Sequence, residues 1–207
     1  MMSLRKTFAV AAVAAVALFT ASCETDPCAN SDCGSQGGCT VIADEPVCLC
    51  NNGYEENADG KCEVRSTSKF VGNWTANESC TDNILNTTFD YTYDVATTES
   101  SADVTKIFME GLAALACGSA GEAEPVVTVA MDAFTIDVAT YCKDNLPASL
   151  EFSGYQFVSG SGTFDDKGDT NAANDEINLT YRVKWTQKEG STTEEFDFSC
   201  TVKMTRK

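Results

Sequence analysis

The distribution of cysteines constrains this 207-residue chain more than any other feature. The eleven cysteines fall into three groups: Cys23 alone after a short apolar run, six between positions 28 and 62, and four spread from Cys80 to Cys200. An odd number of cysteines in an exported protein leaves one without a disulfide partner. If Cys23 is modified instead, the other ten can form five disulfides. The sequence therefore predicts a disulfide-linked protein of an oxidising compartment.

The first 22 residues have the layout of a secretory signal. Basic residues come first, positions 8–19 carry no polar side chain, and small residues lead into Cys23. This apolar run is shorter than the roughly 20 residues that span a bilayer. The segment resembles a bacterial lipoprotein signal, which implies removal of residues 1–22, acylation of Cys23 and a short tether at 23–25. The alternative is ordinary cleavage after Ser22, which leaves Cys23 as a thiol.

The chain is strongly acidic and contains no histidine, with a formal net charge of −17. So negative a chain repels phosphate backbones, and nucleic acid is not expected as a partner. The missing histidine excludes histidine-based triads and the commonest metal ligand. The adjacent carboxylates Glu194–Glu195 and Asp165–Asp166 point to opposite faces of a strand, so neither makes a glycosidase pair. We expect no enzyme and no cofactor.

Residues 26–64 form a candidate disulfide module. Their cysteines follow the spacing C-x4-C-x5-C-x8-C-x1-C-x11-C, and large aliphatic residues are few, so cross-links must replace a core. The stretches Cys48–Tyr54 and Asp59–Cys62 resemble an epidermal-growth-factor-like domain. The resemblance implies a rigid spacer with the pairs Cys28–Cys39, Cys33–Cys48 and Cys50–Cys62. Export and the spacing disfavour the alternative of a zinc site.

The polar linker 65–68 leads into a second domain, 69–207, that reads as mainly β. Apolar residues alternate with polar ones, a period of two typical of strands. The pattern is clear in 89–95, 177–185 and 196–204 and weaker in 70–78, 125–131, 133–140 and 150–164. Segment 104–117 fits either a helix or a strand that ends in a helical turn.

The expected strands would close as an antiparallel barrel or stack as a β-sandwich. The opening Gly72-Asn73-Trp74 resembles the Gly-x-Trp signature of lipocalins and related calycin barrels. The resemblance implies a barrel whose Trp74 closes one end and is covered by Arg206. The whole chain also resembles lipoproteins of Bacteroidetes-type bacteria that pair an epidermal-growth-factor-like module with such a β-domain. This implies a lipid-anchored protein of the outer membrane or cell surface.

The same likeness suggests how the four remaining cysteines pair. The first and last strands of a closed meander are neighbours, so Cys80 can reach Cys200. Cys117 and Cys142 then pair with each other. The other two pairings of these four cysteines stay open.

Two groups of side chains are candidate sites. Aromatic residues of the β-domain could line a cup for a ligand, namely Tyr91, Tyr93, Tyr181 and Trp185, although the alternative is that they fill the core. An acidic turn offers calcium ligands at Asp165, Asp169 and Glu176, but an EF-hand loop would need glycine where Thr170 stands. A solvated hairpin tip is the simpler interpretation.

These features favour an exported, lipid-anchored, non-enzymatic binding protein. Its barrel would hold a small apolar or sugar ligand, and its module would serve as a spacer. The alternative is a structural or adhesive surface module that contacts a partner protein or a glycan.

Overall fold

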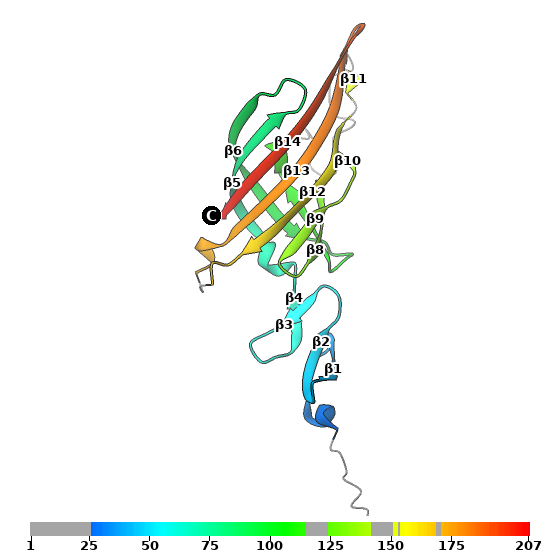
Figure 1. Ribbon diagram of the computed structural model, residues 1–207, viewed down its shortest axis with the longest axis vertical. Coiled ribbons are helices and arrows are strands. Elements are labelled where there is room, and N and C mark those ends of the chain that lie inside the picture. Colours follow the sequence, from blue (N-terminus) through cyan, green and yellow to red (C-terminus); the bar gives the residue numbers. More distant parts are fainter. Residues whose placement is uncertain (1–25, 115–123, 142–150, 153, 169–170) are drawn as a thin grey trace, which may run out of the picture.

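The computed structural model describes residues 26–114, 124–141, 151–152, 154–168 and 171–207. A small disulfide module lies at one end of an elongated molecule and a larger β-barrel at the other (Figure 1). Four residues of interest, Cys23, Cys117, Cys142 and Asp169, lie outside the described residues. Within the described residues, no helix has the length and apolar character needed to cross a bilayer.

The module consists of a 3-10 turn and two small antiparallel hairpins. These are η1 (Pro27–Asn30), β1 (Gly37–Ile42) with β2 (Glu45–Cys50), and β3 (Tyr54–Glu56) with β4 (Cys62–Arg65). Three disulfides cross-link it, in the pairs that the sequence resemblance implied: Cys28–Cys39, Cys33–Cys48 and Cys50–Cys62. Gly37 must be glycine, because a Cβ there would lie 2.5 Å from the sulfur of Cys62. Sulfur packing thus takes the place of an aliphatic core.

Eight strands of the second domain close into an antiparallel barrel. Each strand pairs with the next along the chain, and β14 pairs back with β5. Because β12 pairs with both β9 and β13, the sheet has closed on itself and the β-sandwich alternative is wrong. The strands of the ring are β5 (Gly72–Asp82), β6 (Thr88–Glu99), β7 (Lys106–Glu110), β8 (Val126–Ala130), β9 (Ala133–Ile136), β12 (Tyr155–Asp165), β13 (Glu176–Glu189) and β14 (Thr192–Arg206).

Two short strands extend this ring, β10 (Thr140–Tyr141) beside β12 and β11 (Glu151–Phe152) beside β13. A closed eight-stranded meander is the architecture of lipocalin-like barrels. The expected mainly β fold with a calycin-like barrel is therefore confirmed.

The alternation of apolar residues decides which side of each strand faces inward. On β5, the even-numbered residues from Trp74 to Asp82 are buried and the odd-numbered ones lie on the outer face. The described part of the ambiguous segment, residues 104–114, contains strand β7 followed by the 3-10 turn η3 (Leu112–Ala114). Gly111 ends the strand with φ +84°, and a Cβ there would lie 2.7 Å from the carbonyl oxygen of Asp94. The strand-then-turn alternative is thus the one that forms.

The end of the barrel next to the module is closed by packed side chains. The ring of Trp74 is fully buried, and its indole nitrogen donates to the carbonyl of Phe70 at 3.1 Å. The guanidinium of Arg206 lies 4.4 Å from the centroid of that ring, so the expected cation–π contact is confirmed. Arg206 also donates to the carbonyls of Val71 (2.7 Å) and Lys69 (2.6 Å).

The junction between module and barrel combines a buried linker with partly exposed ion pairs. Linker residues Ser66 and Thr67 are 2% and 0% exposed, and η2 (Ser68–Phe70) follows directly. The ammonium of Lys69 lies 2.7 Å from a carboxylate oxygen of Glu55 in the module and 2.5 Å from one of Asp132 in the barrel. These contacts hold the module against the closed end.

Candidate functional site

The barrel contains a cavity of about 240 Å³ on the side of the Cys80–Cys200 disulfide. The closed end lies at the other end of β5, where Trp74 pairs with Arg206, whereas Phe198 of the cavity wall pairs with Asp82. The wall combines aromatic and aliphatic side chains with one carboxyl group and one disulfide, from Glu78, Cys80, Tyr91, Ala113, Tyr155, Tyr181, Val183, Trp185, Phe198 and Cys200.

Glu78 is the carboxyl group of this wall and is 5% exposed. It faces inward because it shares the buried side of β5 with Trp74 and Cys80. The hydroxyl of Tyr181 on β13 donates a hydrogen bond to Glu78 Oε1, and Tyr93 on β6 is a second hydrogen-bond partner. The backbone N–H of Ala113 donates in turn to the Tyr93 hydroxyl at 3.1 Å. The site is therefore a connected polar network in a largely apolar interior.

Burial governs the acid–base properties of this network. Desolvation raises the pKa of Glu78 above its ordinary value of 4.5, while the hydrogen bonds from Tyr181 and Tyr93 act in the opposite direction. Burial also raises the pKa of the Tyr181 and Tyr93 hydroxyls well above 10.0, and the neighbouring carboxylate adds to this effect. Both phenols therefore remain neutral hydrogen-bond donors at ordinary pH.

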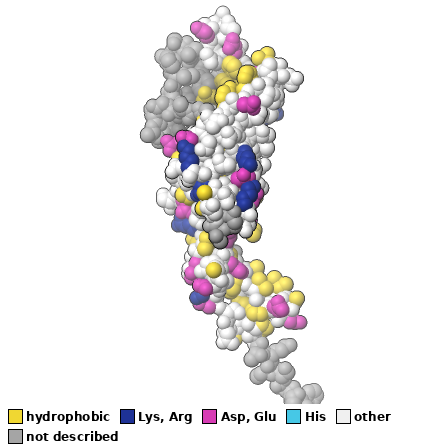
Figure 2. Space-filling model, turned by 90° about the vertical axis from the view of Figure 1, so that its left-hand side faces the viewer, with side chains coloured by type: hydrophobic (Ala, Val, Ile, Leu, Met, Phe, Trp, Pro, Cys, Tyr) yellow, Lys and Arg dark blue, Asp and Glu magenta, His cyan; other side chains and the backbone are white. Residues whose placement is uncertain are grey.

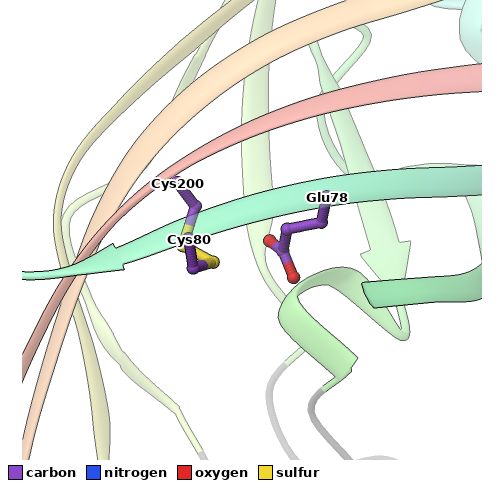
Figure 3. A group of neighbouring side chains, drawn as sticks. All are labelled: Glu78, Cys80 and Cys200. Atoms are coloured by element: carbon purple, nitrogen blue, oxygen red, sulfur yellow. A yellow bond between two sulfur atoms is a disulfide. The ribbon is translucent and has the colours of Figure 1, made fainter. Parts of the chain in front are cut away.

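Glu78 lies beside the disulfide of the barrel, as Figure 3 shows. Cys80 and Cys200 are directly opposite one another on β5 and β14 and are bonded, as expected from their strands. Their sulfur atoms and a Glu78 oxygen lie within 4.8 Å of one another. Disulfide sulfur is not the thiolate that binds metals, so this trio does not make a metal centre.

Three of the four aromatic residues proposed for ligand binding line the cavity, namely Tyr91, Tyr181 and Trp185. The fourth, Tyr93, supports Glu78 from β6. The Trp185 ring stacks with Phe196 and Phe198 at centroid distances of 4.9 and 5.1 Å. These rings are held by their neighbours, so the aromatic part of the wall is preorganised.

Sequence reasoning did not single out Glu78, although the signal for it was present. Every second residue of β5 from Trp74 to Cys80 is apolar except Glu78. Asp82, the other buried acid on this face, ends the strand and accepts hydrogen bonds from the backbone N–H groups of Ile84 and Leu85 in the turn. Glu78 instead interrupts the apolar run inside the strand, where a buried acid carries a desolvation cost and points to a functional group. That break in the pattern is the feature that could have identified it.

The acidic turn is organised by lysines. Lys167 Nζ lies 2.6 Å from carboxylate oxygens of both Asp165 and Glu176. Lys203 Nζ lies 2.7 Å from the second oxygen of Glu176. Ammonium groups therefore take the positions near these carboxylates that calcium would need, and the described part of this turn gives calcium no support.

Acidic residues on the outer surface of the barrel commonly have such partners. Asp197 accepts hydrogen bonds from Arg182 at 2.6 and 2.8 Å, and its carboxylate lies 3.2 Å from the Lys184 ammonium. These cationic groups, Arg182 above all, hold the pKa of the Asp197 carboxyl well below 3.8. Figure 2 shows basic and acidic side chains lying next to each other on one face of the molecule. Glu78 differs from these residues, because the groups that influence it in the described structure include no lysine or arginine.

Comparisons with known proteins give fold-level similarity at most. No protein-family model matches the sequence, and no curated protein is similar to it in sequence. One similar solved structure is a protein of unknown function from the DUF3598 family of Nostoc punctiforme, with 9% identity and a TM-score of 0.25. That match covers 67% of this chain and 48% of the other, so the chain spans about half the length of that protein.

A second similar structure is an S-type phycobiliprotein lyase from Guillardia theta. It has 12% identity and a TM-score of 0.24, and the match covers 67% of this chain and 89% of that protein. Because both TM-scores are so low, the fold of this chain is assigned from its own strand pairing and not from these two structures.

Proposed function

We propose that this chain is an exported, lipid-anchored binding protein whose barrel holds a small ligand. In this proposal residues 1–22 are removed, Cys23 carries the lipid at the outer membrane or cell surface, and the epidermal-growth-factor-like module is a spacer. The protein binds its ligand without reacting with it. The observation that carries the proposal is the aromatic cavity with the buried carboxyl of Glu78.

The size and position of the cavity support ligand binding over simple core packing. A water molecule takes up about 30 Å³ in the liquid, so a cavity of about 240 Å³ admits a small organic molecule. Ligand sites typically join an apolar wall with a few placed polar groups. Here the rings of Tyr155 and Trp185 belong to the apolar part of the wall, and the Glu78 carboxyl and the Tyr181 hydroxyl are polar groups placed in it.

The proposed role of the module as a spacer is supported by the ordered junction. The Glu99 carboxylate of β6 accepts hydrogen bonds from the Thr67 hydroxyl (2.6 Å) and the Arg65 guanidinium (3.3 Å). The Lys69 ammonium forms ion pairs with Glu55 of the module and Asp132 of the barrel. A module held this firmly can act as a spacer, because it would keep the barrel at a set distance from the anchor.

Native mass spectrometry of the purified mature chain tests the proposal. We expect a bound small molecule that is lost on mild denaturation. Val183→Phe should abolish retention by filling the cavity, since Val183 is 4% exposed in its wall. Val64→Phe is the matched control, because Val64 is 37% exposed in the module. The proposal is wrong if neither a retained molecule nor binding from a small-molecule library is detected, or if Val183→Phe retains ligand like its control.

A further inference from the structure

We infer that the cavity selects small organic cations, with Glu78 as the counter-charge and the aromatic wall as the binding surface for an alkylammonium or arylammonium group. This inference rests on the proposed function, since it names the ligand class of the same cavity.

The charge environment of Glu78 favours a cationic ligand. Glu78 is buried, and among the described residues the groups that face it are the Tyr181 hydroxyl from β13, the Tyr93 hydroxyl from β6 and the Cys80–Cys200 disulfide from β5 and β14. None of these is a cation. A buried carboxylate without a cationic partner is costly, and a ligand that brings a positive charge offsets the cost. An anionic ligand would be repelled both by Glu78 and by a chain of net charge −17.

The carboxylate of Glu78 can also accept a hydrogen bond from a ligand. An ionised carboxylate offers about four acceptor sites, and the two phenols use only part of them. The Glu78 carboxylate can therefore accept a further hydrogen bond from an N–H group of a ligand, or lie in close contact with a quaternary ammonium. A sugar would need several polar partners to replace its water. Besides Glu78, the described side chains of the wall offer for this the tyrosine hydroxyls and the Trp185 N–H, and the Tyr181 hydroxyl is already bonded to Glu78.

The aromatic rings of the cavity wall also favour an organic cation. Tyr91, Tyr155 and Trp185 line the same cavity as Glu78. Aromatic faces attract organic cations, and a desolvated contact is worth about 2 kcal/mol. A metal ion would gain less here, because divalent cations need several convergent oxygen ligands and this wall supplies one carboxylate. A small ammonium ion uses both the rings and the charge.

A matched pair of probes tests charge selectivity directly. Choline and 3,3-dimethyl-1-butanol have nearly the same shape, and only choline is charged. Titration of the purified mature chain, followed by calorimetry, should show choline binding at least about tenfold more tightly, a difference of about 1.4 kcal/mol. Benzylamine against benzyl alcohol gives a second, flatter pair, and benzoate serves as the anionic probe.

Two variants identify the groups responsible. Glu78→Gln keeps the shape and removes the charge, so it should cancel the preference for choline and leave the alcohol affinity within about threefold. Tyr91→Leu tests the ring separately, since Tyr91 is 50% exposed and its replacement leaves the core intact. It should weaken choline binding more than alcohol binding. Circular dichroism verifies the fold of both variants.

The possible outcomes separate this inference from the proposed function. Tighter binding of the cations, lost in Glu78→Gln, supports it. Equal binding of cation and isostere, tighter binding of benzoate, or a choline preference that survives in Glu78→Gln overturns the inference and leaves small-ligand binding intact. If no probe binds and no retained molecule is found, the inference and the proposed function fail together.

Discussion

The hydroxyl of Tyr181 on β13 donates a hydrogen bond to the carboxylate of Glu78 on β5, across the intervening strand β14. On β14 itself, Cys200 lies opposite both Tyr181 and Cys80, so the hydrogen bond and the disulfide tie the same three strands together. The structure thus builds a rigid frame around its buried carboxyl. Such rigidity is what a preorganised binding site requires.

The buried carboxyl should make the stability of the barrel depend on pH. Because the folded-state pKa of Glu78 is raised above 4.5, the native state holds a proton that the unfolded state releases first. The contribution of Glu78 to stability therefore falls as pH rises from about 4.5 through its folded pKa. Glu78→Gln removes this loss of stability. In thermal melts, the melting temperature of the variant should therefore increase relative to that of the parent protein as pH rises from about 4 to 8.

Glu45→Gln is the control for this experiment, because Glu45 is exposed on β2 of the module. It makes the same chemical change outside the barrel. If the difference in melting temperature between Glu78→Gln and the parent protein stayed constant with pH, the assignment of a raised pKa to Glu78 would be wrong.

Binding of choline should weaken in acid if Glu78 is its counter-charge. The quaternary ammonium of choline does not titrate, and the neighbouring Tyr93 and Tyr181 hydroxyls have pKa values raised above 10.0. Glu78 is thus the cavity group whose charge changes in the acidic range. The affinity should fall by up to about tenfold per pH unit below its pKa in the apo protein. Calorimetric titrations between about pH 4 and 8 measure this; a pH-independent affinity would show that choline binds elsewhere.

The strands were predictable from sequence because one face of each is buried. Alternation identified the strands that contain Phe89–Val95 and Ile177–Trp185, and register follows from it. Alternation does not reveal where a strand runs past the core. The first half of β6 does so, leaving Phe89 and Tyr91 41% and 50% exposed.

The sequence analysis predicted only the aromatic half of the candidate site. Tyr91, Tyr181 and Trp185 stood out as large residues on inward faces, whereas the only local sign of Glu78 was its break in the apolar alternation of β5. Its importance comes from burial and from the approach of Tyr181, which is 103 positions away. Contacts between such distant segments depend on barrel closure, which no local pattern encodes.

The close approach of module and barrel can be tested at Gly53. This residue has φ +86°, and a Cβ there would lie 2.9 Å from Cγ2 of Val104 in the barrel. Gly60→Ala is the matched control, because Gly60 has φ +75° with nothing within 4 Å of its Cβ position. Both changes carry the left-handed backbone cost of about 1–2 kcal/mol. Gly53→Ala alone should also loosen the junction, seen as faster amide exchange around Thr105; equal exchange in both variants would refute the close contact.

The closed end of the barrel should depend on Arg206. Arg206→Met keeps most of the apolar stem but removes the bonds to the carbonyls of Lys69 and Val71 and the 2.9 Å bond to Asp175. Asp175 is 7% exposed and would lose this charged partner. We expect a loss of about 2–4 kcal/mol in the free energy of unfolding.

Guanidinium denaturation measures this loss, and Lys207→Met is the control. Lys207 pairs with Asp94 at 2.6 Å, but the two side chains are 44% and 72% exposed. Removing such a surface pair costs about 0–1 kcal/mol. Similar losses in both variants would mean that Arg206 does not close the barrel.

The anchor is tested most directly at Cys23. Acyl chains on this residue would supply the membrane affinity of the mature protein, and a chain of net charge −17 would gain little from an anionic lipid surface. Cys23→Ser should therefore move the protein from the membrane pellet to the soluble fraction of fractionated cells. Thr25→Ser, which keeps the cysteine, should leave it in the pellet. If the Cys23→Ser protein also stays in the pellet after an alkaline wash, the membrane attachment does not depend on a lipid at this residue.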